Sequence, residues 1–441
     1  MKNCIAICTL LLAAAAPATG ADLLQIYRQA QVSDAQYGAA RSTWSAGQEK
    51  LPQGLSGLLP SASLSGATQR NDREFRSRDP AVTSTNTSFN SNSITLSAKQ
   101  PLYRPENFTV YEQSKIQVMQ ADAVFAQAAQ DLILRVAQAY FDVLLGQDTV
   151  EFVQAQLTAF SQQLEQAKRN FEVGTATITD THEAQSRYDL TVSTEIAARN
   201  DLELRKRQLE LLIGRAAPGI APLGQRFSLR VPEGNMDRWV AEAADNNLQV
   251  RVGRASLEVA SREIERNRAA HRPTVEAFAS YSDSAAGAGL QGSSVGTDTN
   301  TRVIGVQLAV PLYQGGLISS RVREAIANED KAKQDLESAR RTAELTARQT
   351  FLGVTSGIAL VKALEAALVS SQSALDSTRL GQQVGVRTQV DVLNAQQQLS
   401  QTRRDLAQAK YNYILAMLRL KSSVGQLEEQ DIALVNAWLD K

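Results

Sequence analysis

The sequence contains one unit written twice, and this duplication limits the chain to an architecture with two copies of the same elements. The tripeptide Pro-Leu-Tyr at residues 101–103 recurs at residues 311–313. At a separation one residue larger, Gly174 corresponds to Gly385 and Asp180 to Asp391. A fixed separation between similar landmarks is the signature of a repeat. We therefore predict a first repeat, a linker rich in proline and glycine, a second repeat and a C-terminal tail, at residues 22–214, 215–236, 237–425 and 426–441.

The N-terminus has the pattern of a secretory signal peptide. Lys2 is followed by an apolar run at residues 5–16 and then by small residues up to Ala21, so we assign residues 1–21 to the signal peptide. Both cysteines, Cys4 and Cys8, lie inside it, and we expect no disulfide and no cysteine-bound metal in the mature chain. After the leader we find no run of about 20 apolar residues, the length that a spanning helix requires, and we expect no such helix.

Proline and glycine positions predict two long helical hairpins. No proline occurs at residues 106–217 or 312–441, and proline inside a helix usually breaks it. Val-Gly pairs interrupt these tracts, so we predict long helices over 105–174 and 316–385, each on the order of 100 Å long. After each turn a seven-residue spacing predicts coiled-coil packing. It is formed in the second copy by Leu399, Leu406, Tyr413 and Leu420, and in the first by Tyr188, Glu195, Leu202 and Leu209.

Two tracts with a period of two residues predict a β-hairpin in each repeat. Ile94, Leu96 and Ala98 alternate with polar residues, as do Ile304 and Val306, and this period is typical of strands. We expect four strands of about 9–11 residues, with polar loops at 71–92 and 285–301. Four strands cannot close a barrel, and an open edge is unfavourable in lipid. The subunit should therefore associate, and either two copies with eight strands or three with twelve would satisfy this requirement.

Composition and motifs argue against an enzyme and against nucleic-acid binding. The formal net charge is +0, which gives no electrostatic attraction to a phosphate backbone. His182 and His271 are the only histidines, and no phosphate-binding loop or nucleophile motif accompanies them. We expect no catalytic residue, no metal and no cofactor. The alternative to a channel is a periplasmic scaffold or adaptor built from helical hairpins, which would need no membrane strands.

Several local motifs are similar to those of the TolC family of outer-membrane efflux and secretion channels. They are Pro-Leu-Tyr-Gln-Gly-Gly at 311–316, Val-Gly-Val-Arg at 384–387 with Val-Asp-Val-Leu at 390–393, Tyr-Asn-Tyr at 411–413, and Val-Gly-Thr at 173–175 leading to Ile-Thr-Asp at 178–180. The resemblance implies a mixed α/β membrane protein, a homotrimer with a twelve-stranded barrel and a long α-helical tunnel.

The same resemblance implies a place and partners for the chain. It would lie in the lipid of the outer membrane and extend into the periplasm, where it would serve drug efflux, type I protein secretion or both. Its partners would be a periplasmic adaptor and an inner-membrane transporter of the ABC, RND or MFS type.

The resemblance also implies roles for individual residues. Asp391 would line the pore aperture, where Asn394 replaces a second family aspartate. Gate contacts would involve Thr179, Asp180, Gln382, Arg387 and Lys410, and the adaptor would dock on tips formed by Val173, Gly174, Thr175, Val384 and Gly385. The aspartates also have a structural explanation. Asp180 precedes Glu183 by three positions and Thr388 precedes Asp391 by three, the spacing of helix-capping pairs.

Overall fold

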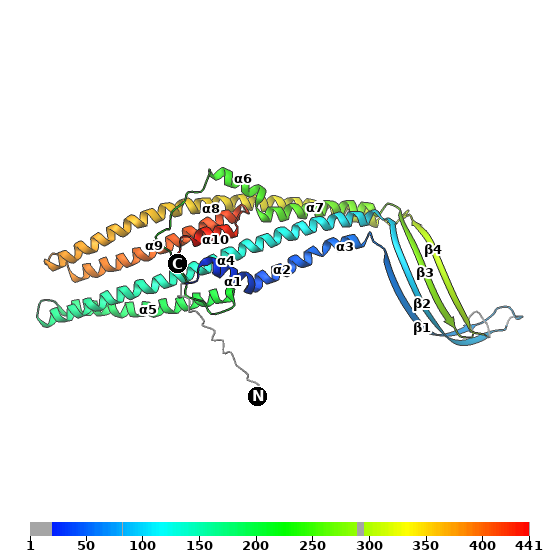
Figure 1. The fold of residues 1–441 in the computed structure, drawn as a ribbon, viewed down its shortest axis with the longest axis horizontal. Coiled ribbons are helices and arrows are strands. Elements are labelled where there is room, and N and C mark those ends of the chain that lie inside the picture. The colour runs from blue at the N-terminus through cyan, green and yellow to red at the C-terminus, as the bar shows by residue number, and fades with distance from the viewer. Residues whose placement is uncertain (1–19, 82, 289–294, 441) are drawn as a thin grey trace, which may run out of the picture. The chain divides into compact units, whose positions relative to one another are not determined.

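A computed structural model describes residues 20–81, 83–288 and 295–440. Most of the chain is helical, and one four-stranded sheet completes it (Figure 1). The helices are α1 Leu23–Ser33, α2 Ala35–Gln48, α3 Lys50–Ser56, α4 Pro105–Glu172, α5 Ile178–Ile213, α6 Met236–Asn246, α7 Leu248–Ala269, α8 Leu317–Gln383, α9 Gln389–Ser423 and α10 Glu429–Asn436. The strands are β1 Ser61–Phe75, β2 Thr85–Tyr103, β3 Thr274–Ala286 and β4 Thr297–Ala309.

The structure confirms the two long helices predicted from the positions of proline and glycine. Helix α4 has 68 residues and α8 has 67, and each ends just before a Val-Gly pair whose glycine has positive φ. Each is followed by a shorter antiparallel helix, α5 or α9, which lies beside it in Figure 1. The mixed architecture of long helices and four strands is therefore confirmed.

The strands are longer than predicted. They run for 15, 19, 13 and 13 residues, so most of the first predicted loop, 71–92, and both ends of the second, 285–301, are strand. The polar residues assigned to the first loop continue the ladder through side-chain bonds between strands. Asn71 donates to the Ser91 hydroxyl at 2.9 Å, and Thr68 donates to the Asn92 amide oxygen at 2.7 Å. Strand pairing thus extends beyond the apolar alternation on which the prediction rested.

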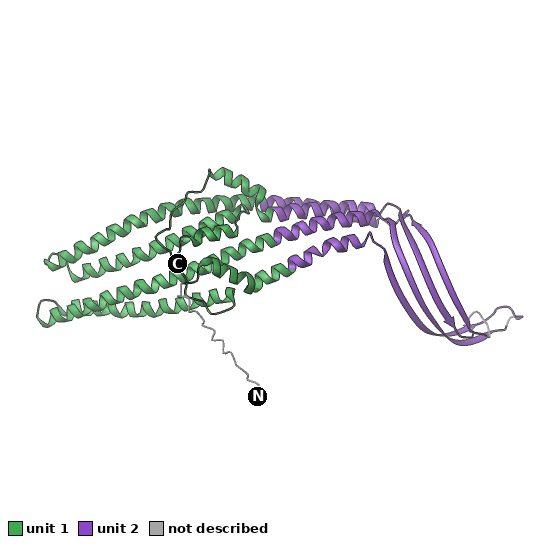
Figure 2. Ribbon diagram, viewed as in Figure 1, with its two compact units in different colours: residues 1–42, 125–250, 340–441 green, residues 43–124, 251–339 purple. Residues whose placement is uncertain are grey.

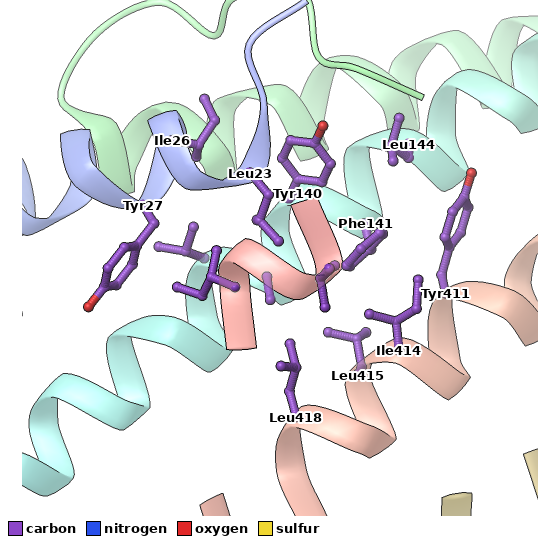
Figure 3. Packing of buried hydrophobic residues seen from close by; sticks show 14 of the residues in the cluster. Leu23, Ile26, Tyr27, Tyr140, Phe141, Leu144, Tyr411, Ile414, Leu415 and Leu418 are labelled. Atoms are coloured by element: carbon purple, nitrogen blue, oxygen red, sulfur yellow. The ribbon is translucent and has the colours of Figure 1, made fainter. Parts of the chain in front are cut away.

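The chain divides into two compact units, each built from several segments (Figure 2). One unit comprises residues 43–124 and 251–339 and contains the sheet; the other comprises 1–42, 125–250 and 340–441. The hydrophobic core of the unit that comprises residues 1–42, 125–250 and 340–441, green in Figure 2, forms where α1, α4, α9 and α10 meet (Figure 3). Tyr140 and Phe141 of α4 are fully buried there, and the Phe141 ring stacks on Tyr411 of α9 at 5.4 Å.

The predicted seven-residue spacing of α9 coincides with buried positions. Leu399, Leu406, Tyr413 and Leu420 are all buried, which confirms the inward-facing stripe. The first copy is less apolar. Leu209 is fully buried, whereas Glu195 is half-buried and accepts a hydrogen bond from Gln154, so a polar contact replaces one apolar layer in this hairpin.

The chain ends pack more closely than predicted. The segment 426–441, assigned to a tail, contains α10, and its Ile432 and Val435 belong to the core. Most of the predicted signal peptide lies outside the described residues, except Gly20 and Ala21. Ala21 forms a backbone bridge with Ile220 of the segment assigned to the linker, so Ala21 is part of the folded unit.

One helix corrects the expectation that no segment could cross a membrane. Among the described residues, α8 contains an 18-residue stretch with a mean hydropathy of 1.7, which is apolar enough to span a bilayer by length and composition. The prediction missed it because it required consecutive apolar residues, whereas α8 mixes leucine, valine and alanine with isolated polar positions. A helix that packs against other helices meets the same criterion.

We expect Asp148→Asn to stabilise the protein at pH 7 and to leave it nearly unchanged near pH 4. The Tyr411 hydroxyl donates to the Asp148 carboxylate at 2.6 Å, and burial raises the pKa of Asp148 above its usual 3.8. The folded chain therefore binds this proton more tightly than the unfolded chain. The carboxyl contributes most to stability below the unfolded-state pKa, and this contribution is lost as the pH rises through the folded-state pKa.

Asparagine removes the charge and still accepts the hydroxyl, so the gain at pH 7 should be on the order of 1 kcal/mol. Denaturant unfolding followed by helical circular dichroism at both pH values measures it. Asp189→Asn, at an exposed position on α5, is the matched control. An equal gain at pH 4 and pH 7 would contradict the assignment of the raised pKa.

Candidate functional site

One face of the sheet carries a cluster of exposed apolar side chains in the single subunit, with Arg302 beside Tyr281 and Asp283 beside Ile94 on the same face. Residues opposite each other on neighbouring antiparallel strands share a face, and the register places Leu64 of β1 beside Leu96 of β2, which lies beside Tyr281 of β3. Ile304 of β4 lies on the same face, opposite Ala279, and is 88% exposed. An extended apolar face of this kind requires a non-aqueous environment or another protein surface.

The opposite face of the sheet is lined by hydroxyl groups. Ser63 lies opposite Ser97, with their oxygens 2.8 Å apart, and Thr95 lies opposite Ser282 at 2.9 Å. Thr301 of β4 continues this row. The sheet therefore separates an apolar surface from one that can hydrogen-bond to water, which is the alternation of a membrane strand in a water-filled barrel.

The two outer strands leave the sheet open. The strand order is β1-β2-β3-β4, so within the described part of the chain β1 and β4 each pair on one side only. Unpaired backbone groups of this kind cost several kcal/mol each in lipid. A single subunit cannot satisfy them there.

A second set of candidate residues lies at the turns that end the two hairpins. Gly174 has φ +79° and Gly385 has φ +83°, a left-handed conformation that glycine adopts without strain. Backbone bonds close both turns, from Thr175 N–H to Asn170 O at 2.8 Å and from Val386 N–H to Gly381 O at 2.9 Å. The valines that precede the glycines, Val173 and Val384, are 72% and 67% exposed. Each hairpin thus presents an exposed apolar side chain at its tip.

The two predicted aspartates start α5 and α9 in the same way. Asp180 accepts hydrogen bonds from the backbone N–H and the hydroxyl of Thr177, at 2.9 and 2.8 Å, and Asp391 accepts the same two bonds from Thr388, both at 2.9 Å. These are capping boxes. The pair Thr388–Asp391 is confirmed, whereas Asp180 pairs with Thr177 and not with Glu183. The bonds from Thr388 lower the pKa of Asp391, so this carboxylate is charged at neutral pH.

The other predicted gate residues are spread along the hairpins of one subunit. Thr179 and Arg387 are exposed beside the two turns. Gln382 donates to Gln389 across the second turn. Lys410 lies 23 residues beyond Arg387 on α9, about 34 Å at helical rise, and its ammonium is 3.5 Å from Glu365 of α8. The single subunit does not bring these four residues and Asp180 together, and their gate role stays a prediction.

One residue near the turns was missed in the sequence. Arg187 of α5 donates to Asn394 and Gln397 of α9, at 3.1 and 2.8 Å. Its position, seven residues after Asp180, places it on the same helix face two turns further on. That spacing could have singled it out, but the sequence does not show which helix this face meets.

No metal-binding chemistry accompanies these features in the described part of the chain. Residues 20–81, 83–288 and 295–440 contain no group of three or more histidine, cysteine, aspartate or glutamate side chains that could hold an ion. His182 is exposed just beyond the first turn. The candidate sites are therefore the two faces of the sheet and the hairpin turns.

Comparison with known proteins gives consistent matches over most of the chain. The family model described as outer membrane efflux protein matches residues 23–215 and 239–426. Outer membrane protein TolC of Vibrio cholerae is 33% identical over 419 residues, which cover 95% of this chain and 94% of the relative. Alkaline protease secretion protein AprF of Pseudomonas aeruginosa is 33% identical over 432 residues, covering 94% and 86%.

Solved structures show the same fold. The CmeC outer membrane channel of Campylobacter jejuni superposes with a TM-score of 0.77 at 16% identity, covering 95% of this chain and 90% of that one. The outer membrane protein VceC of Vibrio cholerae gives a TM-score of 0.76 at 18% identity, with 91% and 96% covered.

Proposed function

Because the chain belongs to the outer membrane efflux protein family and is an outer-membrane channel subunit of the TolC type, we propose that three copies assemble into one conduit. Their four-stranded sheets would close into a twelve-stranded barrel, and their long hairpins would form an α-helical tunnel that reaches into the periplasm. The family is one of channel proteins, and the proposed activity is passage without chemical reaction.

The two-faced sheet with open edges is the observation that carries this proposal. Closure pairs the edge of β4 in one copy with that of β1 in the next and leaves no unpaired edge in lipid. It turns the face of Leu96 and Ile304 outward to lipid and the row of hydroxyls inward to water. Two copies would give eight strands, whose interior is filled by side chains, whereas twelve leave room for a conduit.

The hairpin turns would form the periplasmic aperture and the docking surface. A trimer would place a ring of three Asp391 carboxylates around the opening. Because position 394 is asparagine, a second ring of three carboxylates would be absent there. We expect cation preference, weaker than two rings would give. Thr179, Asp180, Gln382, Arg387 and Lys410 would act in the gate between neighbouring copies. The exposed tips, Val173, Gly174, Thr175, Val384 and Gly385, would receive the periplasmic adaptor.

The wider machine would include an inner-membrane transporter of the ABC, RND or MFS type. Relatives of this chain include TolC proteins and two protease secretion proteins, so the proposed cargo is small molecules, secreted polypeptides or both. We also propose that the signal peptide is removed and that the mature chain consists mainly of the two repeats at 22–214 and 237–425.

Conductance of the purified protein in a planar bilayer, with its oligomeric mass measured in the same detergent, tests the proposal. We expect a trimer with small, long-lived, cation-preferring conductance. A soluble monomer that does not conduct would overturn the proposed conduit, and anion preference would overturn the role of Asp391.

We expect Asp391→Asn to abolish most of the cation preference and the block by multivalent cations, since it removes the proposed carboxylate ring. Single-channel reversal potentials in a salt gradient measure the preference. Asp180→Asn is the matched control, because it changes the same capping position in the first repeat. An equal loss of cation preference in both variants would argue against a specific ring at Asp391.

A further inference from the structure

The strongest feature not yet assigned a role is the contact that Arg187 makes between the two repeats. Its guanidinium, on α5 of the first hairpin, donates to the side-chain oxygens of Asn394 and Gln397 on α9 of the second hairpin. Residues 178–213 and 389–423 are all described, and within them no other hydrogen bond joins α5 to α9. The side chain of Arg187 therefore makes the hydrogen bonds that join α5 to α9.

The surroundings of Arg187 show that apolar packing does not replace this contact. The guanidinium borders a cavity of about 200 Å³ that is lined by residues of α4, α5 and α9, among them Thr149, Thr191 and Ser400. Because the helices are separated by this cavity on one side of Arg187, close-packed side chains do not hold them together there. The clasp of Arg187, Asn394 and Gln397 is thus a local contact that can open without dismantling a core.

The charge of Arg187 adds a second effect. Arginine carries a delocalised positive charge on its planar guanidinium, and both acceptors of Arg187 on α9 are neutral amides. Among the described residues, its only charged partner is Glu183 on its own helix, at 3.6 Å. Asn394 lies one helical turn from Asp391, so the guanidinium brings a positive charge to the level at which the resemblance leads one to expect a second carboxylate.

We propose that Arg187 is a specificity-determining and positioning residue of the conduit, which holds the two hairpins closed at the level of Asn394 and weakens the attraction of the aperture for cations. The proposal rests on the conduit function proposed above. It adds to the proposed gate a contact within one subunit, a cation bound by two amides, at the level where Asn394 stands.

Three substitutions separate the clasp from the charge. Arg187→Gln removes both, so we expect open probability to rise about tenfold, which corresponds to about 1.4 kcal/mol, and the cation-to-anion permeability ratio to rise about twofold or more. Arg187→Lys keeps the charge but loses the planar fork, so openings should increase at an unchanged permeability ratio. Asn394→Asp should form a charge-assisted pair with Arg187 and reduce openings about tenfold.

Arg199→Gln is the matched control, because Arg199 lies on the same helix and, within the described part of the chain, pairs only with Glu195 of that helix. It should change neither readout. If Arg187→Gln behaves like Arg199→Gln in open probability and permeability ratio, the proposal is wrong.

A measurement that does not depend on conduction tests the clasp itself. Spin labels on Val173→Cys and Val384→Cys, in labelled subunits diluted with unlabelled ones, report the distance between the two tips of one subunit by double electron–electron resonance. Arg187→Gln should broaden and lengthen this distance, and Arg199→Gln should not. A channel that fails to conduct even as wild type would count against the proposed conduit, while the label distances would still decide for or against the clasp.

Discussion

Leu96→Lys should prevent the chain from assembling in the outer membrane, whereas the same substitution at the adjacent Ser97 should leave assembly intact. The two residues lie on opposite faces of β2: Leu96 is opposite Leu64 and Ser97 is opposite Ser63. A lysine on the lipid face near the middle of the bilayer costs about 2–4 kcal/mol, and three copies would therefore cost roughly 6–12 kcal/mol per trimer. A lysine on the water-filled face is tolerated and changes ion preference instead.

Outer-membrane fractionation and the yield of oligomer that resists detergent without heating measure this effect. Leu96→Ala controls for the loss of the apolar side chain without a charge and should assemble. Equal assembly of Leu96→Lys and Ser97→Lys would show that the apolar face of the sheet does not meet lipid, and it would favour a scaffold without membrane strands.

Gly425→Ala should destabilise the compact unit of residues 1–42, 125–250 and 340–441 far more than Gly214→Ala. The two glycines nevertheless occupy equivalent positions in the two repeats. Gly425 follows the end of α9 with φ +71°, and Gly214 follows the end of α5 with φ +70°. An alanine in this left-handed conformation costs about 1–2 kcal/mol. A Cβ on Gly425 would lie 2.6 Å from the carbonyl oxygen of Asn246, which is backbone and cannot turn away. A Cβ on Gly214 would meet only the side chain of Ser33, at 3.1 Å.

We therefore expect a loss of roughly 2–5 kcal/mol for Gly425→Ala, the sum of strain and overpacking, against about 1–2 kcal/mol for Gly214→Ala. Denaturant unfolding of both variants, followed by helical circular dichroism, provides the comparison. Similar losses in the two variants would mean that the contact with Asn246 relaxes at little cost and that only the left-handed backbone matters.

The features that could be predicted from the sequence are those that depend on local chemistry. Proline breaks helices and glycine permits left-handed turns, so the limits of α4 and α8 follow from residues such as Pro105 and Gly385. The spacing of Thr388 and Asp391 predicted a cap because a capping box is formed within four residues. Strand positions followed from alternation, but strand ends did not, since hydrogen bonds such as that from Asn71 to Ser91 depend on a partner strand.

The parts that the sequence did not reveal depend on contacts between distant segments. Arg187 and Asn394 are separated by 207 positions, and neither has an unusual local setting. Their meeting requires the packing of two hairpins from different repeats. The same holds for α10, whose short apolar pattern at Ile432 and Val435 gains a role only in a core built from α1, α4 and α9.

The open edges of β1 and β4 also have a consequence for biogenesis. Before assembly, an exported subunit would carry an uncovered apolar face together with two strands able to pair with any other extended chain, a combination that promotes aggregation in water. Transit from the inner to the outer membrane would therefore require either an escorting chaperone that covers this sheet or insertion so closely coupled to oligomerisation that the free subunit never accumulates.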